Sequence, residues 1–255
     1  MRGGVSLIGF AALICLLSSC MAPADSIRLP TATTSPIPPA TVTHTVTAVP
    51  SPTLTLTLTP SPTFTITPTW TPSPTPEPAG CLKPPDDYSR LTVNGWVLNR
   101  RTYAMLQHAA DLYGGEIEIT GYAITQGSYH DNGAASFGTH LGGGAVDLSV
   151  FRKGTYTILK GEIPGLLHAL RVSGFAAWYR IADELYPGSA YHIHAIAIGD
   201  KELSQPAQDQ LTGPAGYFRG FSGIPPTNGA PPTPDRFGGP ILCQWMIDLG
   251  YKDLR

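Results

Sequence analysis

The chain has 255 residues, with 18 acidic and 16 basic side chains and a formal net charge of −2 at pH 7. Only 13% of its residues are charged, and they form no basic stripe. Nucleic-acid binding therefore has no electrostatic support, and we expect no nucleic-acid partner.

Residues 1–20 have the composition of an export signal: Arg2 comes first, and an apolar run follows over residues 5–17. That run is too short to span a bilayer comfortably. Leu17-Ser18-Ser19-Cys20 resembles the lipobox of bacterial lipoproteins, in which the cysteine is lipidated and becomes the new N-terminus. We expect an extracytoplasmic protein anchored to the membrane through Cys20. An ordinary cleavable signal is the alternative.

Residues 21–79 form a low-complexity tract rich in threonine and proline, and no charged residue lies between residue 31 and Glu77. Such a composition cannot build a core, and its prolines favour extended polyproline conformations of about 3.1 Å per residue. Roughly fifty residues of this kind could reach on the order of 150 Å. We expect a disordered tether, whose glycosylation the sequence leaves open.

Residues 80–255 are long enough for one domain with a core of its own. Cys81 and Cys243 lie near its two ends. In an exported protein this pair suggests a disulfide that closes the domain and contributes about 5 kcal/mol in the chain-entropy model. Two free thiols are the alternative.

The first half of this domain predicts a strand or hairpin, a helix and a second strand. Residues 91–99 alternate around Asn94-Gly95, and residues 100–115 carry the apolar spacing of an amphipathic helix. Residues 116–123 alternate as a strand would, with Ile117 and Ile119 on one face. A long loop rich in glycine, serine and asparagine follows over residues 124–144, and long loops inside compact domains are usually functional or disordered.

The second half predicts strands separated by helices. Strands are expected at 145–150, 175–180 and 191–199, helices at 164–175 and 204–211, and a loop at 222–240. The fold class is therefore α+β, with a small, mostly antiparallel sheet and helices packed on it.

Four polar side chains stand in or beside strands that are otherwise apolar. Asp147 points away from the Val146/Leu148 face of its strand, and a carboxylate there needs a partner or a cation. His192 and His194 are two residues apart and project to the same face. Gly142 to Gly144 would let His140 fold back toward Asp147.

Two histidines and a carboxylate are a common ligand set for catalytic zinc, with a fourth position left for water. Each motif is weak alone, since a histidine in a strand is more often a hydrogen-bonded core residue. The occurrence of these motifs together supports zinc binding.

The motifs "SFGTHLGGGAVDLS" (136–149) and "YHIHAI" (191–196), with "TGYA" (120–123) and "GFAAWYR" (174–180), resemble the Hedgehog/D-Ala-D-Ala carboxypeptidase-like zinc peptidase superfamily. The resemblance covers residues 90–200. It implies a Hedgehog/DD-peptidase-like fold in which His140, Asp147 and His194 bind zinc. It also implies that His192 is the neighbouring catalytic histidine, as in the murein endopeptidase branch.

Two positions depart from that family. The carboxypeptidase branch has glutamate where this chain has Tyr191, so His192 would have to transfer the proton. The family arginine after "GY", which helps stabilise the transition state, is replaced by Ala123, and nothing in the sequence shows which other arginine takes its place. The candidates for this arginine are Arg101, Arg180 and Arg219. Possible substrate contacts are Tyr122, Ser128, Tyr191 and Arg180, while His130 is a rim residue and His108 and His168 are structural.

The expected function is zinc-dependent hydrolysis of amide bonds in the peptide part of peptidoglycan by a tethered, monomeric protein. The alternative is an inactive, zinc-stabilised module of the same fold that binds wall peptides. A third reading is a structural lipoprotein in which the His/Asp set is coincidental. Which bond is cleaved, and whether the wall is the cell's own, are left open.

Overall fold

The computed structural model describes residues 76–131 and 133–255. The expected export signal, the lipidation of Cys20 and nearly all of the expected tether lie outside this part of the chain. Within it, every helix is too short or too polar to cross a bilayer.

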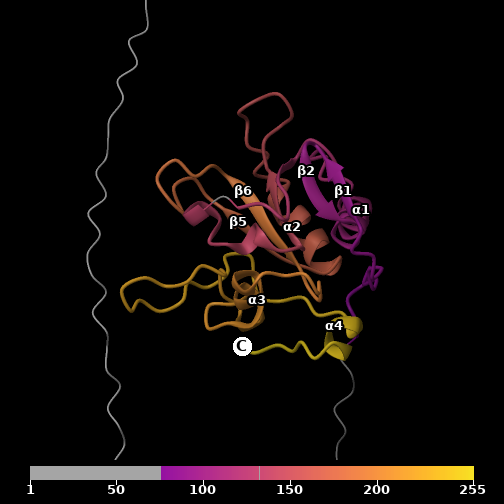
Figure 1. Cartoon of the computed structure of the whole chain (residues 1–255), viewed down its shortest axis with the longest axis vertical. Helices are drawn as coiled ribbons and strands as arrows, with labels where there is room; N and C mark the ends of the chain where they lie inside the picture. Colours follow the sequence, from indigo (N-terminus) through magenta and orange to yellow (C-terminus); the bar gives the residue numbers. More distant parts are fainter. Residues whose placement is uncertain (1–75, 132) are drawn as a thin grey trace, which may run out of the picture. The chain divides into compact units, whose positions relative to one another are not determined.

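The architecture is α+β, with two antiparallel sheets and helices around the larger one (Figure 1). The smaller sheet is a hairpin of β1 (Arg90–Val93) and β2 (Trp96–Asn99). Its turn consists of Asn94 and Gly95, both with positive φ (50° and 83°), a conformation that asparagine and glycine tolerate best. The hairpin predicted over residues 91–99 is confirmed.

The larger sheet has the order β3-β4-β6-β5, and every neighbouring pair is antiparallel. Its strands are β3 (Ile124–Gln126), β4 (Ala145–Ser149), β5 (Phe175–Arg180) and β6 (His192–Ala197). Three of the four strands lie where the sequence predicted strands. The register sets Asp147 opposite His194 and sets His194 opposite Trp178.

The strand predicted over residues 116–123 is wrong. This segment forms a turn, in which the backbone amides of Gly121 and Ala123 both donate to the carbonyl of Glu118. Ile117 and Ile119 are still buried, so their apolar alternation reports burial rather than a strand. The strand begins at Ile124, inside the segment predicted as a loop.

One face of the larger sheet is covered by α1 (Arg100–Tyr113) and α2 (Ile163–Val172). Helix α1 begins where the Asn99 side chain accepts from the Thr102 amide, and it ends at Gly114, which has a φ of 59°. Both helices contribute to the main apolar core. The core residues of these helices are Met105, Leu106, Ala109, Ile163, Leu166, Leu167 and Leu170.

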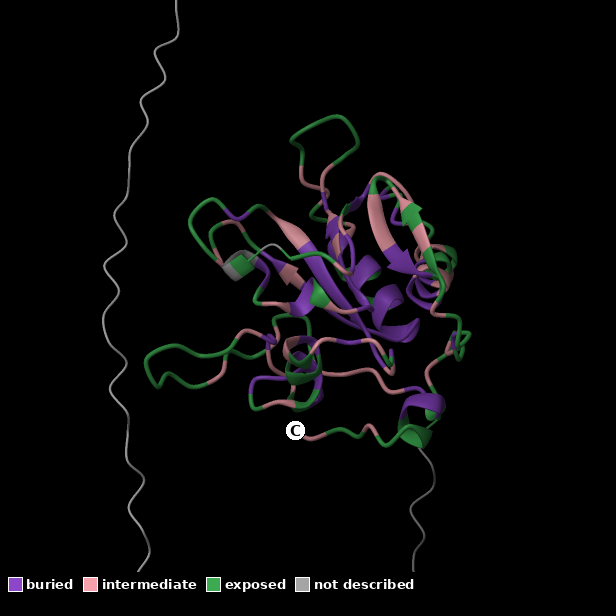
Figure 2. Ribbon diagram, in the orientation of Figure 1, coloured by how far each residue is buried: buried purple, intermediate pink, exposed green. Residues whose placement is uncertain are grey.

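The opposite face packs against α3 (Gln205–Thr212), the 3₁₀ turn Tyr217–Arg219 and α4 (Gln244–Asp248). This second apolar cluster includes Trp178, Ile196, Phe218 and Trp245. Figure 2 shows the sheet and the inward sides of the helices buried between exposed loops. Asp147 and His194 lie on this second face, toward α3.

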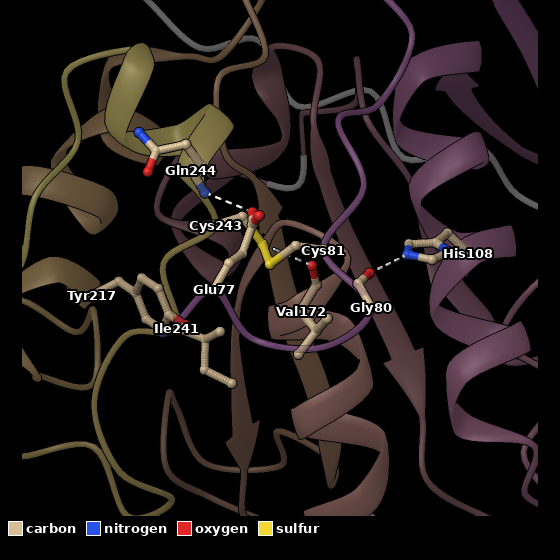
Figure 3. Close-up of a disulfide and its surroundings, with 9 residues drawn as sticks. All are labelled: Glu77, Gly80, Cys81, His108, Val172, Tyr217, Ile241, Cys243 and Gln244. Atoms are coloured by element: carbon tan, nitrogen blue, oxygen red, sulfur yellow. Dashed lines mark hydrogen bonds between the residues drawn. A yellow bond between two sulfur atoms is a disulfide. The ribbon is translucent and has the colours of Figure 1, made fainter. Parts of the chain in front are cut away.

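Cys81 and Cys243 form a disulfide with a Cα–Cα distance of 5.6 Å, which confirms the predicted pairing (Figure 3). The bond joins positions 162 residues apart and lies beside the carbonyl of Val172 at the end of α2. Just before Cys81, the Glu77 carboxylate accepts from the Gln244 amide, and His108 contacts the Gly80 carbonyl. Such a bond is consistent with an extracytoplasmic location.

Candidate functional site

Three predicted ligands come together at the sheet face that packs toward α3. His140, Asp147 and His194 each offer an atom, and these atoms lie within 4.8 Å of one another. Asp147 comes from β4, His194 from the facing position on β6, and His140 from the 3₁₀ turn Thr139–Leu141 just before β4. The group could hold a metal ion.

The three glycines between His140 and β4 are required because this bend runs against residues 199–204. A Cβ on Gly142 would overlap the Glu202 carbonyl and the Ser204 amide, and Gly144 has a φ of 77°. The turn is fixed by a hydrogen bond from the Gly143 amide to the Glu202 carbonyl. The glycines therefore let the chain reverse in a space that no side chain could share.

The outer nitrogen of each histidine is held by a protein acceptor. Nδ1 of His140 donates to the carbonyl of Gly127 at 2.7 Å. Nε2 of His194 lies 3.0 Å from Oε1 of Gln210, on α3. Metal-binding histidines almost always donate their other ring N–H in this way, which fixes the ring orientation and the free nitrogen.

The inner nitrogens of both histidines face the same oxygen of Asp147. Nε2 of His140 is 3.4 Å from Oδ1, and Nδ1 of His194 is 2.7 Å from it. Burial lowers the pKa of His194 to about 4, so this ring is neutral at pH 7. Its proton lies either on Nδ1, which then donates to Asp147, or on Nε2, which then donates to Gln210. In the second tautomer the lone pair of Nδ1 faces the carboxylate oxygen, and a cation between them relieves that repulsion, so the three side chains fit a metal.

The pKa values of Asp147 and His140 are shifted in the directions expected when one carboxylate lies between two imidazole rings. Burial disfavours ionisation of Asp147, but its interactions with His140 and His194, including a hydrogen bond from each, outweigh it and hold its pKa well below the usual range. Burial also disfavours charge on His140, yet the Asp147 carboxylate prevails and raises the His140 pKa. Without a metal, His140 therefore binds a proton more tightly than a free imidazole does.

His192 lies on the same face as His194, as predicted. Its Nδ1 donates to the carbonyl of Ala190 at 2.8 Å, so Nε2 carries the lone pair. This Nε2 lies 4.0 Å from Oδ2 of Asp147. It lines the cavity together with the three ligands.

That cavity has a volume of about 250 Å³. Among the described residues that line it, Asp147 is the only carboxylate, which agrees with the absence of a glutamate at 191. Arg180, from the end of β5, is also on its wall, directly across the strand pair from His192. Apart from the triad and His192, the lining residues are Gln126, Ser136, Phe137, Thr139, Arg180, Leu185, Tyr186, Gln210 and Ile224.

Of the three arginines that the sequence offers as replacements for the family arginine, only Arg180 lines the cavity. Arg101 is buried elsewhere, on the carbonyls of Pro84, Pro85 and Ile198. Arg219 is exposed in the turn after α3. Arg180 is 2% exposed, and burial lowers its pKa to about 10, at which the side chain is still charged at neutral pH.

The remaining expected substrate contacts are placed away from the cavity. Ser128 is buried, its hydroxyl donates to the carbonyl of Ala145, and it does not line the cavity. Tyr191 stacks on Tyr179, and Tyr122 lies beneath Lys153 at a separate surface depression. These two tyrosines do not line the cavity.

Three cavity residues were missed from the sequence. Gln210 orients His194, while the Gln126 amide nitrogen and the Ser136 hydroxyl are buried without a hydrogen-bond partner. A register shift between β3 and β4 places Gln126 opposite Asp147. Neither glutamine has a local sequence signal, because each becomes a site residue only through tertiary packing.

Comparisons of this chain with models of protein families, with curated proteins and with solved structures found no match. The family resemblance therefore rests on the sequence motifs alone.

Proposed function

We propose that this protein is a zinc peptidase of the Hedgehog/D-Ala-D-Ala carboxypeptidase-like type that hydrolyses amide bonds in the peptide part of peptidoglycan. The observation that carries the proposal is the convergence of two histidine nitrogens on one oxygen of Asp147, beside the free Nε2 of His192. Two nitrogens and one carboxylate oxygen are a common protein ligand set for catalytic zinc.

When bound, zinc would act as a Lewis acid on the amide carbonyl and lower the pKa of water at its open position. The protein supplies the rest. His140 and His194 are held by Gly127 and Gln210 so that their ligand nitrogens point inward. Nε2 of His192 faces the same space and can accept a proton from water and return it to the leaving nitrogen.

The second candidate is a wall-binding module of the same fold. Two observations favour it: the cavity offers no glutamate, and Ala123 stands where the family arginine is expected. Arg180 weakens the second of these, because it supplies a cation to the same cavity from another strand.

The placement of the protein belongs to the same proposal. We propose an extracytoplasmic, monomeric protein, held to the membrane through a lipid on Cys20 and a threonine- and proline-rich tether. That arrangement would bring the domain to peptidoglycan peptides.

The first test is metal content. The purified protein should carry about one zinc after zinc repletion. Asp147→Ala should abolish this zinc, and so should His140→Ala, whereas His168→Ala, on the exposed side of α2, should keep it. Elemental analysis of wild type that finds no metal would contradict the proposal.

The second test separates the enzyme from the binder. His192→Ala should keep zinc, because His192 is not one of the three ligands, yet hydrolysis of purified peptidoglycan should fall about 10²- to 10⁴-fold. Mass spectrometry of the released peptides measures this. Unchanged hydrolysis by His192→Ala would remove His192 from the mechanism. Tight wall binding by wild type without hydrolysis of several wall types would favour the binding module.

A further inference from the structure

Tyr129 has a backbone conformation that a bulky side chain rarely adopts. Its φ is 60°, in the left-handed region, and it lies between β3 and the 3₁₀ turn that carries His140. Such a conformation persists only where the surrounding contacts hold it, and strained residues of this kind gather at functional sites. The contacts that hold Tyr129 therefore bear on the function of this loop.

The side chain of Tyr129 is held at both its hydroxyl and its ring. The hydroxyl donates to the Glu202 carboxylate and accepts from the Asn99 amide at 3.2 Å. The Asn99 amide also donates to the Asp200 carboxylate at 2.7 Å, so both of its hydrogens are used. The guanidinium carbon of Arg90 lies 3.5 Å from the centre of the ring, close enough for cation–π attraction. Separate parts of the chain therefore fix this one side chain.

The backbone around Tyr129 runs beside the bend that carries His140. The Tyr129 amide donates to the Gly142 carbonyl at 3.0 Å, and the His130 amide donates to the His140 carbonyl at 2.9 Å. Two residues before Tyr129, the Gly127 carbonyl accepts from Nδ1 of His140 at 2.7 Å. This segment therefore holds both the backbone of the candidate ligand and the orientation of its ring.

Glu202 joins the two sides of this arrangement. Its backbone carbonyl accepts from the Gly143 amide at 2.7 Å, and its carboxylate accepts from the Tyr129 hydroxyl. A Cβ on Gly143 would lie 2.7 Å from that hydroxyl, so a larger residue there would displace it. The three-glycine bend and the contacts of Tyr129 are thus one packed unit.

We propose that Tyr129 is a positioning residue for the candidate metal site: its hydroxyl keeps Gly127 against His140, so that Nε2 of His140 faces Asp147. This inference rests on the metal site of the proposed function and extends it to a residue that does not line the cavity. Without the hydroxyl, the contacts that hold the strained backbone are lost, and we expect the loop to relax away from His140. The hydrogen bond at Nδ1 then opens more often, and Nε2 is less well oriented for a cation.

Three variants of the full-length protein separate positioning from general stability. Tyr129→Phe removes the hydroxyl and keeps the ring that Arg90 contacts. Glu202→Gln keeps an oxygen that can accept from the Tyr129 hydroxyl, so it is the conservative replacement. Tyr113→Phe is the matched control, because the Tyr113 hydroxyl also donates to a partly buried carboxylate, that of Glu162, at the C-terminal end of α1.

The first measurement needs no metal. In protein freed of metal by a chelator and labelled with ¹⁵N-histidine, NMR should show a slowly exchanging Nδ1 proton on His140, which is 1% exposed. Its exchange should be about tenfold faster in Tyr129→Phe, the effect of losing one hydrogen bond. Exchange should be unchanged in Glu202→Gln and in Tyr113→Phe. An unchanged rate in Tyr129→Phe would overturn the inference, whether or not the protein binds zinc.

The second measurement is zinc affinity, by competition with a chromophoric chelator. Tyr129→Phe should bind zinc about tenfold more weakly, the lower end of the loss typical when an outer partner of a metal ligand is removed. Glu202→Gln should keep the wild-type affinity. Tyr113→Phe should keep it too, even where denaturant unfolding shows that both phenylalanine variants lose equal stability. Wild-type affinity in Tyr129→Phe, or equal losses of affinity in both phenylalanine variants, would refute the positioning role.

The two measurements separate this inference from the proposed function. If wild type binds no zinc, the zinc peptidase is contradicted, while faster exchange at His140 in Tyr129→Phe alone still shows that Tyr129 holds this ring. If zinc binds equally well to wild type and to Tyr129→Phe, the metal site stands and the positioning role of Tyr129 is overturned.

Discussion

Two parts of the domain differ in whether their buried polar groups have hydrogen-bond partners. We call the first the closure: here the Cys81–Cys243 disulfide joins the C-terminal segment to the start of the domain, beside the end of α2. Arg171, on α2, binds the same segment through Phe237 and Asp235. The second is the cavity, where no hydrogen bond or ion pair is found for the Arg180 guanidinium or the Gln126 amide nitrogen within the described part of the chain, and where the three candidate ligand atoms lie close together. The closure is complete without a ligand, and the cavity is not.

The difference indicates what each part is for. Interactions in the closure contribute to folding, because every buried donor there that comes from Arg171 has an acceptor. The cavity instead holds buried polar groups for which no partner is found among the described residues, and such groups lower the stability of the free protein. Removing a group should therefore lower stability in the closure and lower binding in the cavity.

The largest expected effect is at the disulfide. Replacing both cysteines, Cys81→Ser with Cys243→Ser, should lower the free energy of unfolding by about 5 kcal/mol, because a crosslink over 162 residues strongly restricts the unfolded chain. Denaturant unfolding of the oxidised protein and of the double variant measures this difference. Zinc affinity of the folded variant should be unchanged. Equal stability of the two proteins would show that the disulfide does not stabilise the closure.

The two buried arginines give the sharpest contrast. Arg171→Gln should cost about 3–5 kcal/mol, because it leaves Asp235 buried without its partner. Arg180→Gln breaks no hydrogen bond or ion pair among the described residues and should leave stability unchanged within about 1 kcal/mol, or raise it. Denaturant unfolding of both variants, with Arg219→Gln as the exposed control, measures the difference. Comparable losses in the two buried variants would show that Arg180 has a structural role.

The same contrast explains what could be predicted from the sequence. The candidate ligands could be named because Asp147 and His194 interrupt apolar strands and three glycines separate His140 from Asp147. The disulfide could be predicted because only two cysteines lie in the domain. The three candidate arginines could not be ranked, since a partner 50 or more residues away decides whether an arginine is satisfied. The separation of Arg171 from Asp235, 64 residues, is of this kind.

The errors have similar causes. Residues 116–123 alternate like a strand, but the backbone carbonyl of Glu118 accepts hydrogen bonds from two backbone amides, and the segment forms a turn. Burial of Ile117 and Ile119 gives the same pattern in either structure. Gln126 enters the cavity through a register shift between two strands, and Gln210 enters it from a helix that packs on the sheet. Neither effect has a signature in the local sequence.

The smallest effect concerns pH and the affinity of the cavity for zinc. In the metal-free protein the pKa of His140 is raised by Asp147, so a proton occupies this ligand at a higher pH than it would in a free histidine, whose pKa is near 6.5. Zinc must displace that proton. Zinc affinity should therefore fall about tenfold per pH unit as the pH falls through the raised pKa.

The slope tests the assignment of the proton. Burial lowers the pKa of His194 to about 4, and the pKa of Asp147 is also low, so neither group takes up a proton in that range. Competition with a chromophoric chelator at a series of pH values measures the affinity, and His168→Ala is the control that should leave the profile unchanged. A loss of about a hundredfold per pH unit would mean that His194 is protonated as well. The crowding of its lone pair against Asp147 would then be relieved by a proton at neutral pH, and the case for a cation between them would weaken.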